Sequence, residues 1–417
     1  GSSALYTDTD GDYNTALGFQ AGYHWKQTAG QGNNVAVGAL AGKGGSVDRD
    51  GSAQANDGVA NTFVGHKAGW GNSVALEGNY NTCMGYLAGE NLSGASQYNT
   101  FIGAEAGEAA GTGDPSSLGV NQYLTFVGNK AGESCDGSTG ATAVGYKALG
   151  SSLAGADNST ALGYEAGQHS NAANNTFIGM GAGKFVEDGA TNTFVGKYAG
   201  FGDTNNKLDG TSNTCIGEQA GVALINTANQ NTFLGASAGN TTTTGVANIC
   251  LGYNTEAEDG TATKQIVIGH SLTGTADDAV FIGDAGDHIR CDWGTDATWD
   301  KVSDKRKKNV LGDSSLGLDF INDLNTVQFT FKAPSEYPKE WTSYDKDKTE
   351  PRNTEVQHGL LAQDVKKALD NAGIDTFSGW SEDPDGCQRI GESAFVIPLI
   401  KAVQELSEKV IKLENKE

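Results

Sequence analysis

The chain has 417 residues, of which 60 are glycine and 6 are proline, and only 8% are aromatic. This small number of large apolar side chains cannot fill several ordinary hydrophobic cores. Another kind of structure must therefore order the chain. The net charge is −23, and residues 1–300 carry −19 of it. A surface this acidic repels phosphate backbones and anionic lipid, which argues against nucleic-acid partners. Membrane insertion is not expected either, because no apolar run is long enough to span a bilayer.

A short core motif recurs fifteen times between residues 14 and 283, as in Asn61–Gly65 and Asn192–Gly196. The mean spacing is about 19 residues, and an Ala-Gly pair follows in eleven of the first twelve copies. Each copy predicts a strand that is too short to be stable alone. If successive copies stack, their strands can pair in parallel and in register, so the repeat predicts a β-solenoid. Equivalent Asn and Thr side chains are expected to hydrogen-bond along the stack.

Both faces of each predicted strand are apolar. The fourth position of the motif is always aliphatic, as at Val195, whereas the third is Phe, Ala, Cys or Val, as at Phe194 or Cys215. Adjacent strand residues point to opposite faces, and one coil covers only its own interior. A homotrimer would cover the other face. We expect the aliphatic position inside the coil and the Phe/Ala/Cys position at the interchain contact, with the reverse assignment open.

Other candidate sites in this region are weak. The Asp8–Asp12 segment fails the spacing of an EF-hand calcium loop, so no metal and no cofactor are expected. Trp25 and Trp70 could stack on sugar rings, but single aromatics are more often packing residues. The long insertions at 43–60 and 108–122 are expected to be solvent loops, with or without receptor contacts. The cysteines have no CxxC spacing and are expected to be buried and unpaired: Cys83, Cys135, Cys215, Cys250, Cys291 and Cys387.

The repeat ends after residue 289, and the composition then becomes that of an ordinary globular domain. We expect a shaft at 1–290, a linker at 291–302 and an α+β domain at 303–417, with a helix near 316–324 and a strand near 327–332. The helix at 396–417 carries a heptad seam typical of a short trimeric coiled coil, although a helix folded back on its own domain would show the same periodicity. The seam residues are Leu399, Val403, Leu406, Val410 and Leu413.

Three motifs after the shaft carry a resemblance to a known family. They are Ser-Asp-Lys-Arg-Lys-Lys at 303–308, His-Gly-Leu-Leu-Ala-Gln-Asp-Val at 358–365 and Val-Ile-Pro-Leu at 396–399. In content and order they resemble the endosialidase-type intramolecular chaperone of bacteriophage tail spikes and fibres. The repeat region is similar to the heads of trimeric autotransporter adhesins.

The resemblance implies a serine endopeptidase that acts once, in cis, with no external substrate. Ser303 would be the nucleophile that attacks the carbonyl of Val302, and Lys308 the general base. A lysine acts as a base only when neutral, a state that desolvation and neighbouring cations favour. Residues five apart on a regular helix point about 140° apart, so either Ser303 precedes the helix or a neighbouring chain supplies one partner. The other residues that the motifs mark are Asp304, Arg306, His358, Gly359 and Gln363.

The function that these features favour is a phage tail fibre or spike in the virion tail, binding a host-surface glycan or protein. The chain opens directly into the repeat, so we expect a region upstream that contacts other tail proteins. A trimeric bacterial cell-surface adhesin with the same chaperone is the alternative. A glycan-degrading spike enzyme is disfavoured because repeats fill residues 14–283.

Overall fold

The computed structural model describes residues 1–6, 8, 12–25, 32–44, 57–71, 78–92, 96–108, 121–135, 137–151, 155–294, 299–301 and 303–415. The chain divides into two compact units, Gly1–Val302 and Ser303–Glu417, and each is described by itself.

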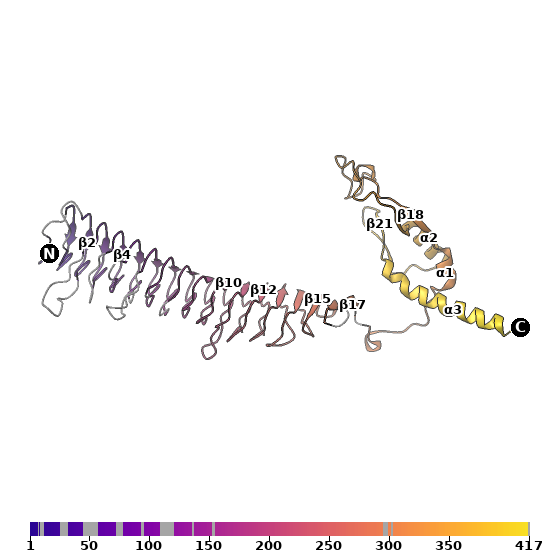
Figure 1. The fold of residues 1–417 in the computed structure, drawn as a ribbon, viewed down its shortest axis with the longest axis horizontal. Helices are drawn as coiled ribbons and strands as arrows, with labels where there is room; N and C mark the ends of the chain where they lie inside the picture. The colour runs from indigo at the N-terminus through magenta and orange to yellow at the C-terminus, as the bar shows by residue number, and fades with distance from the viewer. Residues whose placement is uncertain are drawn as a thin grey trace. The chain divides into compact units, whose positions relative to one another are not determined.

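The first unit is a parallel β-solenoid, as the repeat predicts. Fifteen short strands pair in chain order, each parallel to the next and in register, and Figure 1 shows them as one continuous row. The strands are β1 (Thr15–Leu17), β2 (Val35–Val37), β3 (Thr62–Val64), β4 (Thr82–Met84), β5 (Thr100–Ile102), β6 (Thr125–Val127), β7 (Thr142–Val144), β8 (Thr160–Leu162), β9 (Thr176–Ile178), β10 (Thr193–Val195), β11 (Thr214–Ile216), β12 (Thr232–Leu234), β13 (Ile249–Leu251), β14 (Ile266–His270) and β15 (Ala279–Asp284).

The interior of the coil holds the third position of the motif, so the preferred sequence assignment of the two faces was wrong. Phe194 has an exposed fraction of 0%, and Cys215, its partner on the next strand, is also fully buried. The aliphatic fourth position lies outside: Leu162 and Leu234 are exposed, and Val195 is half-buried. The coil is wide enough for a phenylalanine ring, and burying the ring removes more apolar surface from water than burying a valine would.

The Ala-Gly pair explains how the ring fits. Ala199 is fully buried, and the following Gly200 adopts a φ of +53°. A Cβ atom on Gly200 would lie 2.4 Å from the ring of Phe194, so only glycine allows the wall of the coil to approach the ring this closely. The large residue at the third position and the small pair after it are therefore two halves of one packing unit.

Buried asparagines form a hydrogen-bonded ladder along the shaft, as expected. The Oδ1 atom of Asn213 accepts bonds from the backbone N–H of Asn231 at 3.1 Å and from its Nδ2 at 3.0 Å. The Nδ2 of Asn213 donates to the carbonyl of Ala228 at 2.7 Å. These bonds satisfy polar groups that the coil removes from water, and they hold neighbouring coils in register.

The shaft does not end in the linker expected at 291–302. Strand β16 (Asp287–Asp292) turns back against β15, and β17 (Trp299–Lys301) pairs antiparallel with β16. The predicted linker therefore contains strand residues at both of its described ends. An antiparallel hairpin covers the open edge that the last parallel strand would otherwise expose.

The second unit is a small α+β domain. Its helix α1 and strand β18 correspond to the helix and strand expected near 316–324 and 327–332. Strands β18 and β19 pair antiparallel, as do β20 and β21. The elements are the 3₁₀ helix η1 (Lys305–Lys307), α1 (Leu318–Asp323), β18 (Thr326–Phe329), η2 (Pro334–Glu336), β19 (Gln357–Leu360), α2 (Ala362–Ala372), β20 (Trp380–Glu382), β21 (Gln388–Ile390), η3 (Glu392–Phe395) and α3 (Val396–Glu414).

The long helix α3 packs on this domain through one face only. Pro398 and Ala402 are buried, and the carboxylate of Glu405 accepts a hydrogen bond from the backbone N–H of Leu318 at 2.8 Å. That bond caps the first turn of α1, where backbone N–H groups lack partners within the helix. The core beneath consists of Leu316, Phe320, Val365, Ala368, Leu369 and Phe395.

Candidate functional site

Ser303 and Lys308 lie together within one chain. The Nζ of Lys308 donates a hydrogen bond to the Oγ of Ser303 at 2.6 Å. Ser303 precedes the 3₁₀ helix η1, and Lys308 follows it with a φ of −128° and a ψ of 135°. Because both residues lie outside the helical turn, the separation expected on a regular helix does not apply. Of the two arrangements that the sequence left open, the structure has the one in which the serine comes before the helix.

Asp304 starts the turn that makes this contact. Its carboxylate accepts a hydrogen bond from the backbone N–H of Arg306 at 2.8 Å, the usual role of an N-cap aspartate. The guanidinium of Arg306 also binds the same carboxylate, with its Nη2 at 2.6 Å. Hydrogen bonds from the Arg306 side chain, and then from its backbone, hold the pKa of Asp304 below its usual range. The bonds between Asp304 and Arg306 therefore support the turn that lies between Ser303 and Lys308.

The Ser303–Lys308 pair is open to solvent in the single chain. Both side chains are exposed, as are the neighbouring Lys305 and Lys307. Val302, whose carbonyl would be attacked, lies outside the described residues. The geometry supplies a serine hydroxyl and a lysine amine in contact, and both face solvent.

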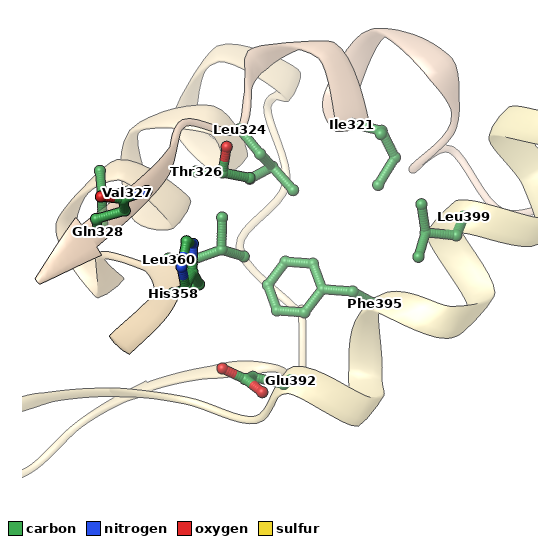
Figure 2. Close-up of a pocket in the computed structure, with 11 residues that line it drawn as sticks. Ile321, Leu324, Thr326, Val327, Gln328, His358, Leu360, Glu392, Phe395 and Leu399 are labelled. Atoms are coloured by element: carbon green, nitrogen blue, oxygen red, sulfur yellow. The ribbon is translucent and has the colours of Figure 1, made fainter. Parts of the chain in front are cut away.

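The second motif lies in a different place. His358 and Gly359, on β19, line a cavity of about 600 Å³ together with residues of β18, α1 and α3, and Gln363 lines a separate cavity at the start of α2. In Figure 2, the ring of Phe395 projects toward Leu360 in the middle of the first cavity. The described residues that line either cavity do not include Ser303 or Lys308. The structure therefore brings the dyad together but does not bring the His-Gly motif to it.

The predicted seam of α3 is largely exposed to solvent. Its five residues have exposed fractions between 44% and 66%, whereas Ala402 on the packed face has 4%. Leu399, the first seam residue, also lines the cavity shown in Figure 2. A helix folded back through its seam would bury these leucines and valines, so the packed face of α3 is a different one.

The shaft has a second unpartnered apolar surface, which we call the outer rank. It consists of the fourth-position side chains of the fifteen motifs, and none of them is buried. Such a continuous apolar row is unusual for a soluble monomer, whose exposed apolar residues are normally scattered. Its members are Leu17, Val37, Val64, Met84, Ile102, Val127, Val144, Leu162, Ile178, Val195, Ile216, Leu234, Leu251, Ile268 and Ile282.

One group of carboxylates has the spacing of a possible cation site. Oxygens of Glu105, Glu108 and Glu133 lie within 4.8 Å of one another. The Nζ of Lys130 lies 2.7 Å from Glu105 and 2.6 Å from Glu133, so a protein cation already pairs with two of the three carboxylates. Burial, and then the neighbouring glutamates, raise the pKa of Glu108.

The remaining sequence candidates are structural. Trp25 is fully buried in the shaft core, and the ring of Trp70 lies 4.1 Å from the Nζ of Lys67. Four cysteines are buried, Cys291 and Cys387 are partly buried, and none of the six is in a disulfide. Residues 9–11 of the acidic turn and most of both long insertions lie outside the described residues. In the described part of the chain, no helix combines the length and apolarity needed to cross a membrane.

With this geometry in view, comparison with known proteins gives one match. Residues 303–374 match the family model described as chaperone of endosialidase. The matched segment begins at Ser303, the first residue of the second compact unit, and includes both Lys308 and the His-Gly motif. No curated protein matches the chain. No solved structure matches it either. In this chain a β-solenoid shaft is therefore followed by a segment similar to the chaperone of endosialidase.

Proposed function

We propose that this chain is the shaft of a trimeric phage tail fibre or spike, assembled by its C-terminal domain and then released from that domain by self-cleavage. The observation that carries the proposal is the 2.6 Å contact between Ser303 and Lys308 at the start of the matched chaperone segment. This hydroxyl and this amine would then act on the bond before Ser303, the first residue of the second compact unit.

The cleavage step follows from that contact. Neutral Lys308 removes the proton of the Ser303 hydroxyl while Oγ attacks the carbonyl carbon of Val302. The C–N bond to Ser303 breaks, and the lysine ammonium returns its proton to the departing amine. The resulting ester between Val302 and the Ser303 oxygen is hydrolysed by water, which leaves a carboxylate on the shaft and a free hydroxyl on the chaperone. The same lysine serves as base and then as acid.

Two exposed apolar surfaces support the homotrimer. The outer rank runs along the shaft, and the seam runs along α3, so one set of partner chains would cover both. Because the coils of the solenoid are alike, neighbouring shafts could pack against each other shifted by one coil. A trimer formed first by the C-terminal domains would align the three chains before the shafts pack. We therefore assign the alignment of the chains to the second unit and the lasting interface to the outer rank.

Assembly would also switch on the cleavage. Ser303 and Lys308 are exposed in one chain, so packing of neighbouring chains around them would remove water and favour the neutral amine that the mechanism needs. Cleavage would then follow trimer formation and make it hard to reverse, because the aligning domain is lost.

Mass analysis of the purified protein tests the proposal. The native assembly should contain three shafts, and denaturation should release a fragment that ends at residue 302 and another that begins at Ser303. A folded, monomeric chain that keeps all 417 residues would overturn both parts of the proposal.

A further inference from the structure

An aromatic cavity on the shaft lies apart from the outer rank. It has a volume of about 380 Å³ and is built by four successive coils, those of β9 to β12. None of its lining residues belongs to a strand, so they do not take part in the outer rank. Its size falls within the range of about 300–1,000 Å³ that is typical of small-molecule sites.

An irregularity in the backbone ladder creates the cavity. The backbone N–H of Phe185 donates to the carbonyl of Phe201 at 3.0 Å, but the carbonyl of Phe185 accepts from the N–H of Leu208. Gly202 still donates to the carbonyl of Val222, and the carbonyl of Lys207 accepts from Asn226, so the four residues 203–206 between them leave the ladder. Gly202 precedes this excursion with a φ of +77°, a conformation that favours glycine. The excursion forms one wall beside the two phenylalanine rings.

The aromatic rings form a corner of the cavity. The rings of Phe185 and Phe201 are 5.1 Å apart at 88°, and Tyr198 meets Phe201 at 5.0 Å and 76°. His169 stacks on Phe185 at 5.3 Å, so one face of that ring is already covered. Phe201 is the more exposed of the two phenylalanines, and the next coil lines the cavity with Ala223 and Ile225. Phe201 is therefore the ring best placed to receive a ligand.

Hydrogen-bonding groups stand beside the rings. One carboxylate oxygen of Asp203 accepts from the N–H of Asn205 at 2.9 Å, and its other oxygen has no hydrogen-bond partner among the described residues. The hydroxyl of Thr243 donates to the carbonyl of Gly260, which leaves its oxygen able to accept another bond. The cavity thus combines an apolar ring with acceptors that suit hydroxyl donors.

We propose that this cavity binds a neutral saccharide, with one sugar ring packed on Phe201 and its hydroxyls donating to Asp203 and Thr243. The C–H groups on a sugar face suit the negative face of an aromatic ring. A cationic ligand fits less well, because the Nζ of Lys184 already lies 5.2 Å from the Phe185 ring and 6.0 Å from the Phe201 ring. An anionic sugar would meet Asp203 and the strongly acidic chain.

This inference deepens the proposed attachment role and rests on it for its biological use, but the binding can be measured separately. Saturation-transfer NMR on the full chain would use glucose, galactose, mannose, rhamnose and N-acetylglucosamine as probes. At least one should receive saturation at its ring protons. Phe201→Ala and Asp203→Asn should each weaken its binding by about tenfold or more, because one removes the stacking ring and the other the charged acceptor.

Matched variants separate a site from a folding defect. Asp203→Asn keeps an oxygen that can accept from Asn205, and Phe201→Tyr keeps the ring, so the latter should retain binding. Tyr164→Ala removes an exposed ring elsewhere on the shaft and should leave binding unchanged. No transfer to any probe, or equal transfer in the Phe201→Ala and Tyr164→Ala variants, overturns the saccharide site. A chain that binds sugar but neither trimerises nor cleaves overturns the proposed function instead.

Discussion

The hydroxyl of Ser303 and the amino group of Lys308 are 2.6 Å apart although the two residues are five positions apart in the sequence. The short 3₁₀ turn that Asp304 caps brings them together, because it reverses the direction of the chain between them. The contact is therefore local, and it forms without help from a second chain. The proposed cleavage, in contrast, would need partner chains to exclude water from the exposed pair.

The first prediction concerns the dyad. Ser303→Ala and Lys308→Ala should both abolish cleavage, because the first removes the nucleophile and the second the base. Lys307→Ala is the matched control, since Lys307 is an exposed neighbour within the turn, and it should cleave normally. Denaturing electrophoresis of the assembled protein measures the outcome. Normal cleavage in Lys308→Ala would exclude lysine as the base.

The second prediction concerns the consequence of cleavage. Wild type and Ser303→Ala heated side by side in detergent should differ, with the cleaved shaft resisting dissociation longer. The reason is kinetic: loss of the aligning domain removes the route back to separated chains. The half-life of the trimer at one temperature is the measurement. Equal half-lives would show that cleavage has no part in locking the fibre.

The third prediction separates the two faces of a strand. Phe233→Asp places a charge inside the coil and should prevent the shaft from folding, since Phe233 has 0% exposure. Leu234→Asp, one residue later on the outer rank, should leave each coil folded but block trimer formation. Circular dichroism reports the fold and light scattering the mass. Trimers of Leu234→Asp with normal yield would remove the outer rank from the interface.

The fourth prediction concerns the asparagine ladder. Asn213→Ala removes the acceptor for two groups of Asn231, and an unpaired buried polar group costs about 1–3 kcal/mol. Hydrogen exchange at the backbone amide of Asn231 should accelerate by about 5- to 150-fold, while distant coils change little. Asn206→Ala, on the exposed excursion, is the control and should leave exchange at Asn231 as it was. Unchanged exchange in Asn213→Ala would mean that the ladder contributes nothing to register.

The fifth prediction concerns the seam of α3. In a Ser303→Ala background, which keeps the second unit attached, Leu406→Asp should stop trimer formation because it places charge in the predicted interhelical contact. Gln404→Asp lies on another face of the helix and should still assemble. Sedimentation gives the mass of each. If Leu406→Asp assembles as well as Gln404→Asp, the seam is not the contact that aligns the chains.

Much of this protein can be read from the sequence, because local rules determine it. The spacing of the fifteen motifs predicts stacked strands, since a strand this short requires a neighbour. The change in composition after residue 289 marks the second domain, and the Ser303–Lys308 motif marks its start. Asp304, a favoured N-cap residue, was a further signal that a turn begins after Ser303.

Only the tertiary structure decided which face of each strand is inside. Alternation along a strand separates Phe194 from Val195, but both are apolar, so the pattern itself cannot say which one the coil encloses. The deciding contact joins Phe194 to Gly200, where the wall of the coil comes too close to the ring for any side chain. The aromatic cavity likewise depends on where residues 203–206 leave the backbone ladder. Both features depend on the path of the coil in three dimensions, so local propensity does not determine them.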